Sequence, residues 1–173
     1  MLIPPSRSSS TGFSLVELMI GIAITSILLG LAMPSFKIWL QNSQIRNAAE
    51  SIQNGLQRAR AEAVGRNASV EFELSADSSW VVRLAGGADL ESRSANEGSK
   101  NVTLTTDPVA ATTVTYNNFG GIGTNADGTD SLLQVEIDSP SLEASESQEL
   151  RVTIGLGGNV RMCDPNAPAP RGC

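Results

Sequence analysis

The part of the sequence that decides the fold is GFSLVELMIGIAITSILLGLAMPSF, residues 12–36. Its last 19 residues, 18–36, contain no charged side chain. As a helix they would extend about 28 Å, close to the hydrocarbon thickness of a bilayer. Apolar side chains occupy every face of this helix, whereas a core helix of a soluble domain has one apolar stripe. The run therefore predicts a membrane-anchoring helix rather than a buried core helix.

A secretory signal peptide is the alternative interpretation of this segment. The polar leader, residues 1–12, supplies one cation, Arg7. The apolar run is longer than the apolar region of a signal peptide, however, and no Ala-x-Ala cleavage site follows it. Both features favour an anchor.

A single acid, Glu17, lies at the beginning of the apolar run. A carboxylate at the centre of a membrane costs about 2.5–3.5 kcal/mol, so Glu17 should either lie at headgroup depth or have a partner. If the chain is cut after Gly12, the new α-amino group of Phe13 is a suitable cation. The amine of one helix would then meet the carboxylate of a neighbouring helix and set the register of a helical stack. Both readings of Glu17 remain open from the residues alone.

Residues 37–66 continue as an amphipathic helix. Arg58 and Glu62 are an i,i+4 pair on its solvated polar face. Pro34 lacks a backbone donor and clashes with the carbonyl of Gly30, so a kink or local melting is predicted there. The apolar positions recur at helical spacing and are mostly alanine, which suits close packing on a sheet: Ile45, Ala48, Ala49, Ile52, Leu56, Ala59 and Ala63.

Beyond Arg66 the apolar residues alternate with polar ones, which predicts short strands separated by Gly, Asn, Asp and Ser clusters. The fold class expected is α+β, a long N-terminal helix packed on an antiparallel sheet. Loops 86–101 and 117–131 show no pattern and are expected to be mobile or to face a partner. The predicted strands are 70–74, 80–84, 102–104, 114–116, 133–137, 150–154 and 159–162.

Composition excludes several classes of function. The chain has no histidine, which removes imidazole-based catalysis, and its two cysteines are too few for a structural zinc site. Asp127 and Asp130 lie in a Gly-containing loop without the spacing of a calcium-binding loop, so a solvated turn is expected. We predict no enzyme, no cofactor and no metal site.

Charge divides the chain along the same lines. Residues 37–66 have a net charge of +3 and residues 67–173 a net charge of −9. The basic beginning of the second helical half suits a position near anionic lipid headgroups, with the acidic part soluble. Such an acidic balance argues against a general nucleic-acid-binding surface.

Gly12, Phe13 and Glu17, followed by an apolar helix with Pro34, resemble the class III signal of type IV pilins and type II secretion pseudopilins. The resemblance implies cleavage between Gly12 and Phe13 by prepilin peptidase, a membrane aspartic protease, with N-methylation of Phe13. It also implies assembly from the inner membrane, where the chain would be single-pass with a periplasmic head, into a fibre at the cell surface. Glu17 and Pro34 would then be assembly residues.

Residues 56–67, Trp80 and residues 157–165 are similar to the GspH/FimT-like family. The expected organisation is a leader (1–12), a transmembrane and assembly helix (13–36), an amphipathic helix (37–66) and an antiparallel β head (67–173). An exported head reaches an oxidising compartment, where Cys163 and Cys173 would pair into a small terminal loop; two free thiols are the alternative. This terminal loop favours the FimU/FimT-type minor pilins within the family.

Some pilins of the FimT kind bind DNA through a Gly-Arg-x-Arg motif near this end. Here the sequence is Gly158-Asn159-Val160-Arg161, so the first arginine is missing. Arg161 and Arg171 remain as candidate phosphate contacts, with Arg151 nearby. Against an acidic head, DNA binding is disfavoured, and Arg161 is better read as the end of a strand beside acidic neighbours.

The resulting prediction is a structural minor pilin of a type IV pilus that helps prime assembly or forms the tip. Its partners would be other minor pilins, the major pilin, prepilin peptidase and, before assembly, inner-membrane lipid. A type II secretion pseudopilin is the first alternative, and a DNA-binding minor pilin for transformation is the second.

Overall fold

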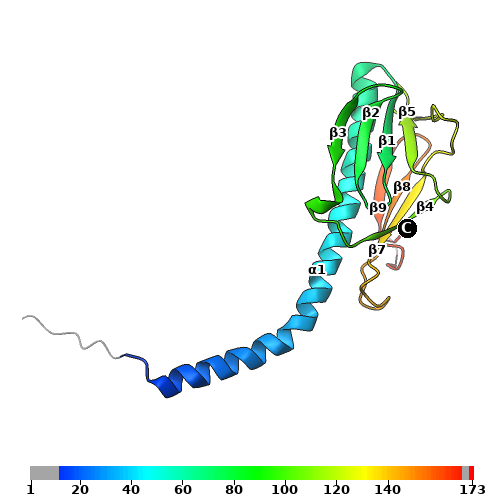
Figure 1. Cartoon of the computed structure of the whole chain (residues 1–173). Helices are drawn as coiled ribbons and strands as arrows, with labels where there is room; N and C mark the ends of the chain where they lie inside the picture. Colours follow the sequence, from blue (N-terminus) through cyan, green and yellow to red (C-terminus); the bar gives the residue numbers. More distant parts are fainter. Residues whose placement is uncertain (1–11, 169–171) are drawn as a thin grey trace, which may run out of the picture. The chain divides into compact units, whose positions relative to one another are not determined.

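A computed structural model describes residues 12–168 and 172–173 of the chain (Figure 1). It contains two compact units, residues 1–37 and 38–173, and one helix contributes to both. The elements are α1 (Leu15–Arg66), β1 (Val70–Leu74), β2 (Trp80–Leu84), β3 (Asp89–Arg93), the 3₁₀ helix η1 (Ala95–Glu97), β4 (Thr103–Asp107), β5 (Thr113–Tyr116), β6 (Ile122–Gly123), β7 (Gln134–Asp138), β8 (Leu150–Ile154) and β9 (Val160–Cys163).

In the first unit, α1 begins with an N-cap at Ser14. The Glu17 backbone N–H donates to Ser14 Oγ at 3.3 Å, which satisfies one of the free donors of the first turn. The helix then continues through Gly30 and Pro34 without a break. Of the two outcomes predicted at Pro34, a kink or local melting, local melting is absent, because the loss of one hydrogen bond does not interrupt the helix.

The apolar run of α1 is not a core helix. The most apolar 18-residue window of α1 has a mean hydropathy of 2.3, and none of it is buried. Thr25 Oγ1 and Ser26 Oγ each donate at 2.8 Å to the carbonyl four residues earlier, at Gly21 and Ile22. Polar atoms satisfied within the helix, together with exposed apolar side chains, are what a lipid environment requires.

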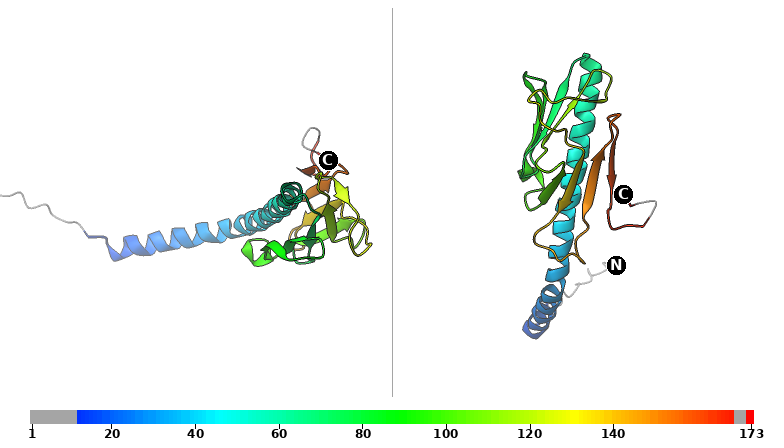
Figure 2. Two further views of the ribbon diagram at one scale, coloured as in Figure 1. Left: turned by 90° about the horizontal axis from the view of Figure 1, so that it is seen from above. Right: turned by 90° about the vertical axis from the view of Figure 1, so that its right-hand side faces the viewer.

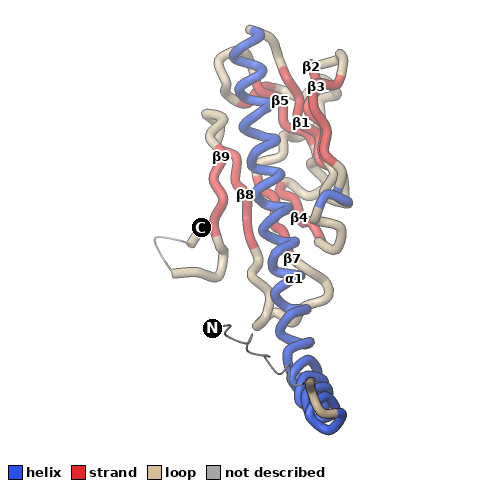
Figure 3. The backbone as a smooth tube through the Cα atoms, turned by 90° about the vertical axis from the view of Figure 1, so that its left-hand side faces the viewer, coloured by secondary structure: helices blue, strands red, loops and turns tan. Residues whose placement is uncertain are grey.

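The second unit is α+β, as predicted, but it has two antiparallel sheets where the sequence indicated one. The first has the strand order β3-β2-β1-β5-β6 and the second the order β4-β7-β8-β9. The residue 38–66 part of α1 runs along their junction, with β8 and β9 on one side and β1, β2 and β3 on the other (Figures 2 and 3). Among the residues that the structure describes, every buried core side chain belongs to this unit, so it should fold without residues 1–37.

The alanine-rich stripe of α1 faces the sheets, as its spacing predicted. Its members are almost completely buried: Ile45, Ala48, Ala49, Ile52, Leu56, Ala59 and Ala63. Ser51 on the same face accepts a 2.8 Å hydrogen bond from Trp80 Nε1, and both groups are buried. The Trp80 ring lies against Phe72, with ring centroids 5.8 Å apart. These rings occupy the space that small helical residues leave.

Gly55 sets how closely α1 approaches the first sheet. A Cβ at this position would lie 2.7 Å from Phe72 Cε2 and 3.0 Å from Trp80 Cδ2. Gly55→Ala should therefore destabilise the 38–173 unit by about 1–3 kcal/mol in urea unfolding, despite the better helix propensity of alanine. Gly65→Ala is the matched control, since nothing lies within 4 Å of its added Cβ. It should lose no stability. Equal or higher stability of Gly55→Ala would contradict this packing.

Tyr116 is the only tyrosine of the chain and is fully buried. Its hydroxyl has no hydrogen-bond partner among the described residues, and burial raises the pKa of the phenol far above its usual value near 10. The unfolded chain releases this proton near pH 10 and the folded chain does not. The titration of Tyr116 should therefore lower the free energy of unfolding only as the pH rises above about 10. Tyrosinate absorbance is expected to appear only together with unfolding; ionisation near pH 10 in a folded chain would contradict this.

The two loops that show no sequence pattern, and that were expected to be mobile or to face a partner, contain short elements of secondary structure. Residues 86–101 contain β3 and η1, and residues 117–131 contain β6. The buried Asn125 fixes the second loop: its Nδ2 donates to the Thr113, Thr129 and Asp130 carbonyls, and its Oδ1 accepts from Thr115 Oγ1. β3 escaped prediction because it is an exposed edge strand of mostly polar residues.

Candidate assembly interface

Gly12 and Phe13 lie just before the first turn of α1. The Phe13 side chain is 86% exposed, and nothing lies within 4 Å of a Cβ built on Gly12. The backbone between them is therefore accessible to another protein. This is the position at which the sequence predicts cleavage.

Glu17 lies one turn further along the same face. It lines a shallow groove of α1 with Phe13, Leu18, Gly21, Ile22, Thr25 and Ser26. Within the described part of the chain its carboxylate has no ion-pair partner. The groove brings together one carboxylate, the exposed Phe13 and small residues that admit a second helix. This arrangement suits an incoming amine from a neighbouring copy of the motif.

The spacing of charges along α1 makes the two interpretations of Glu17, a residue at headgroup depth and a partner of a neighbour's amine, compatible with each other. Glu17 and Lys37 are 20 residues apart, which is about 30 Å of helix and equals the hydrocarbon thickness of a bilayer. In a membrane both charges can lie at headgroup depth at the same time. The carboxylate would become buried only when the helix leaves lipid for a protein bundle, where it then needs its partner.

The polar face of the second helical half forms local ion pairs. Arg58 Nη2 lies 3.0 Å from Glu62 Oε1, which confirms the predicted pair, and Arg66 Nε lies 2.5 Å from Glu62 Oε2. The hydrogen bond from Arg66 lowers the pKa of Glu62. Arg58 also lies 3.2 Å from Glu91 on β3. The three arginine–glutamate pairs lie at the surface of the head, where ion pairs contribute little stability.

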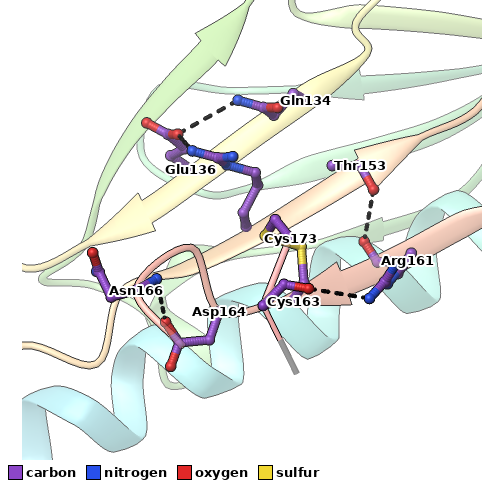
Figure 4. The surroundings of a disulfide bond; sticks show 10 residues. Gln134, Glu136, Thr153, Arg161, Cys163, Asp164, Asn166 and Cys173 are labelled. Carbon is purple, nitrogen blue, oxygen red and sulfur yellow. Dashed lines mark hydrogen bonds and ion pairs between the residues drawn. A yellow bond between two sulfur atoms is a disulfide. The ribbon is translucent and has the colours of Figure 1, made fainter. Parts of the chain in front are cut away.

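At the carboxyl end, Cys163 and Cys173 form a disulfide (Figure 4). The loop that it closes returns to the sheet through a bridge between Asp164 and Gly172. Arg161 donates from Nη2 to the Gly172 carbonyl at 3.2 Å, so this arginine is used to hold the loop.

Of the residues considered for DNA contact, the two arginines that the structure describes are engaged within the head. Arg151 is paired with Glu136, and Arg161 binds the terminal loop. Arg171 lies outside the described residues.

The loop with Asp127 and Asp130 is a solvated turn, as predicted. Asp127 Oδ1 accepts a hydrogen bond from the Thr129 backbone N–H at 3.0 Å, which lowers the pKa of Asp127. Among the described residues, no group of three side chains could hold a metal ion.

One surface was not found by sequence reasoning. Phe119 and Leu156, on the turns that follow β5 and β8, are 85% and 79% exposed. Arg60 of α1 joins these turns by donating Nε–H to the Gly120 carbonyl at 2.9 Å and Nη2–H to the Gly157 carbonyl at 3.3 Å. A large apolar residue inside each of two Gly- and Asn-rich turns was the signal available.

Two protein-family profiles match the chain. The profile described as type II transport protein GspH matches residues 48–167, and the profile of the prokaryotic N-terminal methylation motif matches residues 7–33. A search of curated proteins gave no match.

Solved structures share the fold. The crystal structure of the type IV minor pilin FimU of Pseudomonas aeruginosa superposes with a TM-score of 0.50 at 19% identity, covering 74% of this chain and 98% of the chain in that structure. The structure of the minor pseudopilin EpsH from the type 2 secretion system of Vibrio cholerae gives a TM-score of 0.53 at 13% identity, covering 72% of this chain and 99% of the chain in that structure. At these identities the likeness shows the fold, a long helix packed on antiparallel sheets.

Proposed function

The chain belongs to the GspH family of type IV pilin-like proteins, and from this premise we propose that it is a minor pilin of a type IV pilus. The structural neighbours named above are a type IV minor pilin and a minor pseudopilin of a type 2 secretion system, and such subunits assemble with other pilin-type chains. The observation that carries the proposal is the methylation motif followed by an exposed apolar helix on a pilin-type head.

In this proposal, each segment of the chain has its own role in maturation and assembly. Prepilin peptidase cuts between Gly12 and Phe13, and Phe13 is N-methylated. Residues 13–36 anchor the chain in the inner membrane and later pack among other pilin helices, with Glu17 accepting a neighbour's amine and Pro34 facing the bundle. Residues 37–66 support the β head, residues 67–173, in the periplasm and then at the cell surface. Its role is to prime assembly or to form the tip with other minor pilins and the major pilin.

A minor pseudopilin of type II secretion is the second candidate. The description of the matching family and the fold of EpsH favour it. The disulfide-closed loop at the carboxyl end supports the pilus, because that terminal loop resembles the FimU/FimT branch.

Deletion of the gene distinguishes a role in a type IV pilus from a role in type II secretion. The pilus proposal expects surface pili to be lost or strongly reduced while exoprotein secretion continues, and a plasmid copy should restore the pili. Accumulation of folded exoproteins in the periplasm with normal pili would instead establish the secretion role and overturn the pilus role.

A further inference from the structure

Three large apolar side chains are exposed together at the end of the head where α1 ends. Val64 is 52% exposed, and Phe119 and Leu156 are exposed by more than three-quarters. The Gly120 position lies beside Val64, and the Ile122 N–H donates to the Leu156 carbonyl at 3.2 Å. We call Val64, Phe119 and Leu156 the apolar tip.

The turns that present the apolar tip are held rigidly. A Cβ on Gly158 would lie 1.8 Å from the Gly120 carbonyl oxygen, so the two turns are in backbone contact. Asn117 Oδ1 accepts from the backbone N–H groups of Phe119, at 2.9 Å, and Gly121, at 3.1 Å. Together with the two hydrogen bonds that Arg60 donates to these turns, these contacts hold the apolar tip in one conformation in the absence of a partner. Such pre-organisation lowers the entropy cost of binding.

The apolar tip is also uncharged, although the head around it is acidic. Residues 117–126 and 155–160 contain no charged side chain, whereas residues 67–173 carry a net charge of −9. Arg60, the cation that contacts these turns, is engaged by two carbonyls. A charged partner would therefore be desolvated here without compensation, and an apolar, uncharged surface fits.

The position of the tip favours a protein over a lipid surface. Val64 is 26 residues from Ile38, which is about 39 Å of helix. The tip is thus at the end of the head opposite the beginning of this unit. In the fibre proposed above, the head of a neighbouring subunit, rather than lipid, can reach this end.

We propose that the apolar tip is the surface on which a different pilin-type subunit of the same fibre docks an apolar, uncharged patch of its head. This inference rests on the proposed function, since it needs a fibre. It adds the contact surface and the chemistry of the partner. Phe119 is the central residue of the contact, because it is the most exposed of the three.

The test places a photo-reactive phenylalanine analogue at position 119 of the full chain in the cells that produce it. Light should give a covalent adduct with another pilin-type subunit, identified by mass spectrometry, at least fivefold stronger than from position 144. Ala144 is the matched control, because it is exposed in the loop whose Glu146 carbonyl binds Asn42, near the other end of the head.

A double variant, Phe119→Ser with Leu156→Ser, gives a second readout. Both side chains are exposed, so the head should keep its unfolding midpoint while the amount of chain in sheared fibres falls at least fivefold. An adduct with lipid, with a second copy of this chain or with a protein lacking the pilin motif would overturn the inference, as would no adduct from a chain present in fibres. Absence of the unmodified chain from all fibres would instead overturn the proposed function.

Discussion

Glu17→Ala is expected to leave the chain in the membrane but to reduce its recovery from fibres at least tenfold. In lipid the carboxylate can lie at headgroup depth, so its loss makes insertion no harder. In a packed helical bundle the same change would leave the neighbour's α-amino group buried without a counter-charge. Removing one partner of a buried pair costs about 3–5 kcal/mol, more than the 1.4 kcal/mol that corresponds to a tenfold effect.

The measurement compares the membrane and sheared-fibre fractions by quantitative immunoblotting. Glu50→Ala is the matched control, because Glu50 is an exposed acid on the same helix beyond the apolar run. This control should assemble normally. Incorporation of Glu17→Ala at the wild-type level would show that the carboxylate is only a headgroup flank and would remove the pairing mechanism.

Gly12→Leu should block maturation almost completely, so that the chain keeps residues 1–12 and runs as a larger species on a gel. The structure places nothing within 4 Å of a Cβ at this position. The substitution therefore leaves the fold unchanged, and its effect must come from the protease, which has to approach the backbone closely. Without cleavage there is no Phe13 amine, and assembly should fail as well.

Gly21→Ala is the control for this experiment, since it also changes a glycine with open space around it in the same segment. It should be processed like the wild type. If Gly12→Leu were cut to the same size as the wild type, the cleavage position would have been assigned incorrectly.

Much of the fold could be predicted because its determinants are local patterns. The alanine stripe from Ala48 to Ala63 and the alternation in β1 and β2 each have a period that reports burial. The uncharged run after Glu17 has no such period, and its length and its apolar residues on every face indicate a membrane helix. The second sheet could not be predicted this way. Whether β4 pairs with β7 or with a strand of the first sheet depends on contacts between residues far apart in sequence.

The assembly motif was visible for a similar reason, since a lone acid in an apolar run is conspicuous. The apolar tip was not visible, because its residues come from α1, from the turn after β5 and from the turn after β8. Nothing in the local pattern around Phe119 indicates that Arg60, about 60 positions earlier, holds the turn. Gly158 likewise is required only because the Gly120 backbone lies against it in the folded structure.

The intact mass of the chain released from sheared fibres tests the central claim most directly. The account predicts a chain that begins at Phe13, carries one additional methyl group and has lost two hydrogens to the Cys163–Cys173 disulfide. A mass that corresponds to a chain beginning at Met1 would contradict it, because no amine would then be available at Phe13 to meet Glu17.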